Sequence, residues 1–221
     1  MQRNPYIKLS VITLFAIAMG YLESAVVVYL REIYYPEGFA FPLKMMSGKI
    51  AITEIYRELA TMLMLAAIGY LSGRNRMQRF GVFLYAFGIW DIFYYIFLKL
   101  LIGWPESLLT WDILFLVPVT WVGPVLAPSI NALTMCVLGG MIFYYEDQDT
   151  RVRIRPLHWA LLIVGSLVII ASYTYDYNGS MLASYVPAKF NWWIFGTGQT
   201  MLILAIVFIF NRRISPSFKG D

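Results

Sequence analysis

The chain has 221 residues, of which 60% are hydrophobic and 17% aromatic, whereas only 14% are charged. With a mean hydropathy of +0.66, this composition excludes an ordinary soluble domain and predicts an integral membrane protein that has the lipid bilayer as a partner. The net charge of +4 does not indicate nucleic-acid binding, because the basic residues lie in short clusters between apolar runs. The single cysteine, Cys136, excludes an intrachain disulfide and a cysteine zinc site.

Six apolar runs are long enough to cross a bilayer, which takes about 20 helical residues. They predict an all-α, polytopic transmembrane bundle that forms a single domain over residues 1–221. The runs cover about 9–30, 51–72, 80–102, 118–145, 157–175 and 191–211. The first run carries Glu23 and lacks a convincing small-residue cleavage site, so we interpret it as a retained helix instead of a signal peptide.

Two connections carry further predictions. Residues 31–50 mix prolines, aromatics and charges, and we expect them to fold over the outer face as a lid. The segment Trp104-Pro105-Glu106-Ser107, followed by LLTWDILF, is interpreted as a short interfacial helix that precedes span four. Prolines and glycines then predict a broken stretch at the outer end of span four, forming a wall of the site. These residues are Pro118, Gly123, Pro124 and Pro128.

The basic clusters predict the topology, because cytoplasmic loops of membrane proteins are enriched in Lys and Arg. If both termini are cytoplasmic, most basic residues fall on the cytoplasmic side, including two arginine clusters at 74–79 and 151–155. A seven-span alternative would divide 105–145 into two helices and would move the second cluster outside. The charge bias rejects that alternative. We expect the chain to lie in a bacterial-type inner (plasma) membrane.

With this orientation, four acids and one arginine fall in the outer half of the bilayer. Glu23 lies on the first span and Asp91 on the third. Glu54, Arg57 and Glu58 open the second span, where spacings of three and four residues place them on one helical face. Arg57 can therefore bridge one or both of these glutamates. Asp112, in the predicted short helix, either joins this site or is a solvated capping residue.

A charged side chain in a membrane span is costly, so such residues usually face the bundle interior and often mark a functional site. Four carboxylates and one guanidinium cannot all stay ionised and unbalanced in a medium of low dielectric constant. The sequence thus predicts binding or transport of a proton, a metal ion or a small cationic solute. The predicted binding residues are Glu23, Glu54, Arg57, Glu58, Asp91 and Asp112.

Three alternatives stay open. The charges could fix helix packing, which is as good an interpretation as function for Glu23 and Glu54. The chain could instead be an accessory subunit of a larger membrane complex, with partner subunits that neutralise its charges. It could also be a membrane enzyme that acts on a lipid or isoprenoid, with Arg57 holding a phosphate. No cofactor is indicated. The only histidine, His158, lies at the opposite side of the membrane from the acids.

Overall fold

The computed structural model describes residues 5–44, 46–116, 119–148, 150–175, 186–187 and 189–211. These residues form six long helices and one β-hairpin. The helices are α1 (Pro5–Tyr34), α2 (Gly48–Ser72), α3 (Arg76–Ile102), α4 (Leu126–Asp147), α5 (Pro156–Thr174) and α7 (Trp192–Asn211). The strands are β1 (Trp111–Phe115) and β2 (Trp121–Pro124). The predicted helical bundle is confirmed at this level.

Five of these helices are long and apolar enough to cross a membrane, namely α1, α3, α4, α5 and α7. Although α2 has 25 residues, it falls outside this group because Glu54, Arg57 and Glu58 lower the apolarity of its first half. The helix nevertheless packs along α3 beside α1, so its polar face is held inside the bundle. This placement brings the charged residues of α2 to the interior of the bundle.

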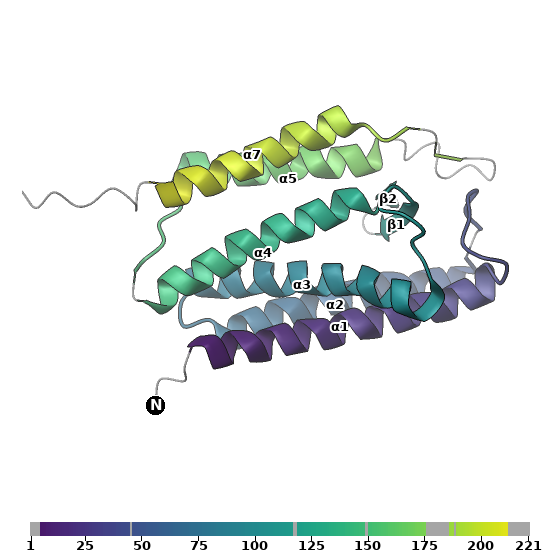
Figure 1. Ribbon diagram of the computed structural model, residues 1–221, viewed down its shortest axis with the longest axis horizontal. Helices are drawn as coiled ribbons and strands as arrows, with labels where there is room; N and C mark the ends of the chain where they lie inside the picture. The colour runs from purple at the N-terminus through teal and green to yellow at the C-terminus, as the bar shows by residue number, and fades with distance from the viewer. Residues whose placement is uncertain are drawn as a thin grey trace, which may run out of the picture.

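The bundle is organised around α3, which packs against α1, α2 and α4 (Figure 1). Close approach of α3 and α4 depends on glycine, because a Cβ atom at Gly139 would collide with the carbonyl oxygen of Gly81. On the other side of α4, α5 and α7 form an antiparallel pair. That pair also meets through glycines, since a Cβ atom at Gly198 would lie 2.7 Å from the carbonyl oxygen of Gly165.

The segment before α4 is a β-hairpin, so the predicted short interfacial helix is wrong. β1 and β2 are antiparallel, with Asp112 opposite Gly123 and Ile113 opposite Val122. The aromatic and β-branched residues of β1, Trp111, Ile113 and Phe115, favour a strand. β2 supplies the pairing partner, which an interpretation of the local sequence as a helix does not consider. The all-helical architecture holds for the bundle, and the structure adds this one hairpin to it.

The same pairing moves the start of the fourth helix. Span four was expected to begin near residue 118, but α4 begins at Leu126 because residues 121–124 are strand. Pro118 lies outside the described residues. The hairpin sits at the end of the bundle where α1 and α3 end and α2 and α4 begin (Figure 1). We call this the hairpin end. The cluster that starts at Arg74 lies at the start of α3, and the cluster that starts at Arg151 lies in the connection before α5; both are at the opposite end of the bundle.

Candidate functional site

A cavity of about 500 Å³ lies at the hairpin end of the bundle. Residues from α1, α2, α3, α4, α5 and the hairpin segment line it, together with the connection between α1 and α2. All six predicted binding residues border this cavity: Glu23, Glu54, Arg57, Glu58, Asp91 and Asp112. The structure thus brings together side chains that are up to 89 positions apart in the numbering of this sequence. Their role in binding stays a prediction.

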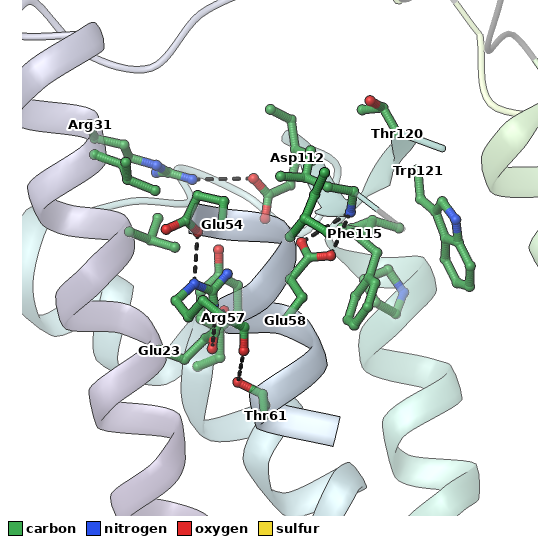
Figure 2. A pocket seen from close by; sticks show the side chains of 18 of the residues that line it. Glu23, Arg31, Glu54, Arg57, Glu58, Thr61, Asp112, Phe115, Thr120 and Trp121 are labelled. Atoms are coloured by element: carbon green, nitrogen blue, oxygen red, sulfur yellow. Dashed lines mark hydrogen bonds and ion pairs between the residues drawn. The ribbon is translucent and has the colours of Figure 1, made fainter. Parts of the chain in front are cut away.

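Arg57 forms two ion pairs, one with Glu54 on its own helix α2 and one with Glu23 on α1 (Figure 2). Its Nη1 atom lies 2.5 Å from Oε2 of Glu23, and its Nε atom lies 2.7 Å from Oε2 of Glu54. The predicted bridge to Glu54 is confirmed, but the second partner is Glu23 on α1 and not Glu58. The side chains of Glu23 and Glu54 are only 12% and 6% exposed, so Arg57 neutralises charge that solvent hardly reaches.

Glu58 ties α2 to the hairpin. Both carboxylate oxygens accept a hydrogen bond from the backbone N–H of Leu116, each at 3.0 Å. Leu116 directly follows β1, so this contact fixes the start of the hairpin turn against the second helix. Because every residue except proline has a backbone N–H, the identity of residue 116 gives no sign of this contact in the sequence.

Asp91 differs from the other acids of the cavity. It lies on α3 and lines the cavity, yet within the described part of the chain its carboxylate has no hydrogen bond and no ion pair. The charges that act on it most strongly are those of Asp112 and Glu23, which repel a second negative charge. Asp91 is therefore the carboxylate best placed to take a cationic partner from outside the chain.

Asp112 forms an ion pair that sequence analysis missed. Its Oδ1 atom lies 3.2 Å from Nη2 of Arg31, and the two side chains point toward one another from β1 and α1 (Figure 2). Burial raises the pKa of the Asp112 carboxyl to about 6, although the Arg31 guanidinium opposes this shift. The Arg31 guanidinium also lies over the rings of Trp104 and Phe39, 3.6 and 4.6 Å from their centroids. Asp112 is thus a buried, paired residue and not a solvated cap.

The connection between α1 and α2 forms part of the cavity wall, and its role as a lid stays a prediction. Phe39, Leu43, Lys44 and Met46 all line the cavity. The connection is held by two tyrosines at the end of α1, since the hydroxyl of Tyr35 accepts from the backbone N–H of Lys44 at 2.7 Å. The hydroxyl of Tyr34 likewise accepts a hydrogen bond from the backbone N–H of Ser47 at 3.1 Å. A ligand entering past this connection would meet aromatic and basic side chains first.

Other polar residues of the spans divide between packing and the cavity. Gln199 of α7 donates a hydrogen bond to the Thr134 hydroxyl of α4, and this contact joins the two helices. Asn131 instead borders the cavity. Of the residues predicted to form a wall, Pro128 lines the cavity, whereas Gly123 and Pro124 belong to β2 and do not.

Sequence reasoning also missed the aromatic wall of the cavity. It includes Trp90 and Tyr94 from α3, Trp121 from β2 and Tyr173 from α5. The rings of Trp121 and Tyr173 stack with centroids 6.1 Å apart and planes 21° from parallel. Only the tertiary fold places a β2 residue against α5. The density of aromatic residues in the sequence was the one available signal, and interfacial anchoring explained it equally well.

The described residues of the cavity do not form a set of ligands for a metal ion. Among the described residues, no three His, Cys, Asp or Glu side chains form a group that could hold a metal ion. The five cavity carboxylates are instead spread over four elements, and those of Glu23, Glu54, Glu58 and Asp112 already contact donors of the chain itself. This arrangement suits a ligand that needs one carboxylate and an apolar surround.

Comparison of the chain with protein-family models, with curated proteins and with solved structures finds no match.

Proposed function

We propose that this chain is a six-span membrane protein that binds a small cationic solute in the cavity at its hairpin end. In this proposal α2 crosses the membrane in addition to the five more apolar helices. Both termini are cytoplasmic, and the hairpin end faces the outside of a bacterial-type inner membrane. The positive-inside rule supports the orientation, because the two arginine clusters that start at Arg74 and Arg151 lie together at the end opposite the hairpin.

The observation that carries the proposal is the imbalance of charge around the cavity. Five carboxylates line it against three basic side chains, those of Arg31, Lys44 and Arg57. Arg57 is shared by two glutamates, and Arg31 pairs with Asp112, so Glu58 and Asp91 have no basic partner among the described residues. A bound cation would compensate this charge in a site of low dielectric constant.

Aromatic side chains add to the attraction for an organic cation. A cation within about 6 Å of an aromatic ring is stabilised by the negative face of the ring, by about 0.5–2 kcal/mol depending on desolvation. Asp91 stands in a helix turn that also carries Trp90 and Tyr94, both of which line the cavity. The volume of about 500 Å³ falls in the range of small-molecule sites.

The alternatives receive less support from the geometry. An accessory subunit would use its buried charges to pair with a partner helix, yet both arginines of the site already have partners within this chain. A lipid-processing enzyme would need Arg57 to hold phosphate, but its guanidinium is engaged by Glu23 and Glu54. Neither alternative explains a carboxylate left open in a cavity.

A matched ligand series tests the proposal. The purified protein in lipid nanodiscs would be titrated by calorimetry with ω-amino alcohols of two to six carbons and with the diols of the same length. The two series differ only in whether an ammonium or a hydroxyl occupies one end. We expect the ammonium compounds to bind about 10- to 100-fold more tightly, as a charged hydrogen bond provides. Equal affinity of the two series at every length would contradict cation binding.

A further inference from the structure

Buried polar atoms without a hydrogen-bond partner gather around the cavity. Among the described residues, six side-chain atoms are buried and lack a partner. Five of them belong to residues that line the cavity. These five are Nη1 of Arg31, Nε1 of Trp90, Oδ2 of Asp112, Nε1 of Trp121 and the hydroxyl of Tyr173. Four of the five can donate a hydrogen bond.

Unpartnered polar groups of this kind are unusual in a folded protein. More than nine-tenths of buried polar groups have a partner, and each exception calls for an explanation such as a missing ligand. Tyr173 and Trp90 are each 6% exposed and Asp112 is 2% exposed, whereas Trp121 is half-buried as a residue although its Nε1 atom is buried. A ligand that accepts hydrogen bonds would explain why these atoms are concentrated at one cavity.

Two of these donors form one surface. Trp121 and Tyr173 come from β2 and α5, and their rings lie nearly parallel with centroids 6.1 Å apart, so the indole N–H and the phenol O–H belong to a single aromatic wall. Asp91, the acid without a partner, borders the same cavity from α3. The cavity therefore offers the Asp91 carboxylate to a cation and the N–H and O–H groups of Trp121 and Tyr173 to a hydrogen-bond acceptor. Its walls carry more carboxylates than basic groups.

We propose that the ligand is an organic ammonium compound that also carries a neutral oxygen acceptor, such as a hydroxyl, ether or amide carbonyl. This inference rests on the proposed cation binding and adds the second functional group. The ammonium pairs with Asp91, and the oxygen accepts from Trp121 and Tyr173 after a small rotation of their rings. A carboxylate is a poorer choice for the second group, because the surplus of acids around the cavity would repel it.

The test compares ligands with and without the oxygen in protein with and without the donor. ω-Amino alcohols and alkylamines of equal length would be titrated into wild type and Tyr173→Phe in nanodiscs. In wild type, the amino alcohol of the preferred length should bind about two- to tenfold more tightly than the alkylamine, as expected for one neutral hydrogen bond. In Tyr173→Phe this advantage should shrink, while the affinity for the alkylamine stays unchanged.

Controls separate this inference from the proposal on which it rests. Tyr175→Phe removes a hydroxyl from an exposed side chain at the end of α5 and should leave both affinities unchanged. Tyr173→Phe should fold normally, since its hydroxyl has no partner to lose. If alkylamines and amino alcohols bind equally well, water forms the hydrogen bonds with Trp121 and Tyr173, and this inference is wrong. The proposed cation binding would still hold in that case. Tighter binding of an ω-amino acid would overturn the choice of a neutral oxygen.

Discussion

At the scale of single residues, Arg57 is the counter-charge of the site. It contacts two carboxylates at 2.5 and 2.7 Å, and the loss of one member of a buried ion pair usually costs about 3–5 kcal/mol. Arg57→Ala should therefore lower the thermal unfolding temperature in detergent at pH 7. Arg57→Lys should recover part of the loss, because lysine keeps the charge but not the planar fork of donors.

The triple variant Arg57→Ala with Glu23→Gln and Glu54→Gln provides the control for Arg57. It removes the positive charge together with both negative ones, so it should unfold at a higher temperature than Arg57→Ala alone. If Arg57→Ala melts like wild type, the arginine is not a structural counter-charge. Retained stability with lost ligand binding would instead favour the enzyme alternative, in which Arg57 holds a substrate phosphate.

The raised pKa of Asp112 predicts that the stability of the protein depends on pH. This pKa is raised by burial from 3.8 to about 6, so between these pH values the folded state holds a proton that the unfolded state has released. Stability from this residue is greatest below pH 4 and is lost as the pH rises through 6. The difference in unfolding temperature between wild type and Asp112→Asn should therefore be larger, in favour of wild type, at pH 4 than at pH 7. A constant difference would contradict the raised pKa.

At the scale of elements, the contact between α3 and α4 positions Asp91 opposite the hairpin. Gly139 lies where a Cβ atom would collide with Gly81, whereas a Cβ atom on the adjacent Gly140 would meet only the ring of Tyr85, at 3.7 Å. Gly139→Ala should destabilise the protein by about 1–3 kcal/mol through overpacking. Gly140→Ala should be neutral or slightly stabilising, since alanine favours helices over glycine. Equal unfolding temperatures of the two variants would contradict this packing.

The elements also show which parts of the fold could be predicted. Apolar runs predicted the helices well, because the thickness of a bilayer sets their length. The β-hairpin was missed because a strand depends on its partner, and β2 is only four residues long and rich in residues that also suit a broken helix. Pro105 indicated a helix start, yet residues 103–110 form turns and coil. Local sequence could not decide between these outcomes.

Within the site, contacts between residues close in sequence could be predicted, whereas contacts between distant segments could not. Helical periodicity grouped Glu54 with Arg57 correctly, since that relation is local. Arg31 lies one residue beyond the predicted first span, 9–30, so the sequence does not place it in the site, yet it pairs with Asp112 from the end of α1. The contact of Glu58 with a backbone N–H, and the stacking of Trp121 on Tyr173, depend on where the hairpin folds back. Such contacts require the tertiary structure.

At the scale of the whole molecule, the proposed orientation makes a direct prediction. Single cysteines at Glu37 and Ser107, both exposed at the hairpin end, should react with a membrane-impermeant thiol reagent added outside intact cells. A cysteine at Gln148, after α4, should react only when the membrane is opened. The background should be Cys136→Ala, which removes the natural thiol. Labelling of Gln148 from outside would support the seven-span alternative and contradict the six-span topology.

Cation binding in the cavity depends on Asp91, the carboxylate without a hydrogen-bond or ion-pair partner among the described residues. The most direct measurement titrates the best-binding ω-amino alcohol into wild type, Asp91→Asn and the control Glu37→Gln, which changes an exposed acid outside the cavity. We expect Asp91→Asn to weaken binding about 10- to 100-fold, because it removes the charge that pairs with the ammonium while keeping the size of the side chain. Glu37→Gln should bind like wild type. Unchanged affinity in a folded Asp91→Asn protein would contradict the assignment of this cavity as a cation site.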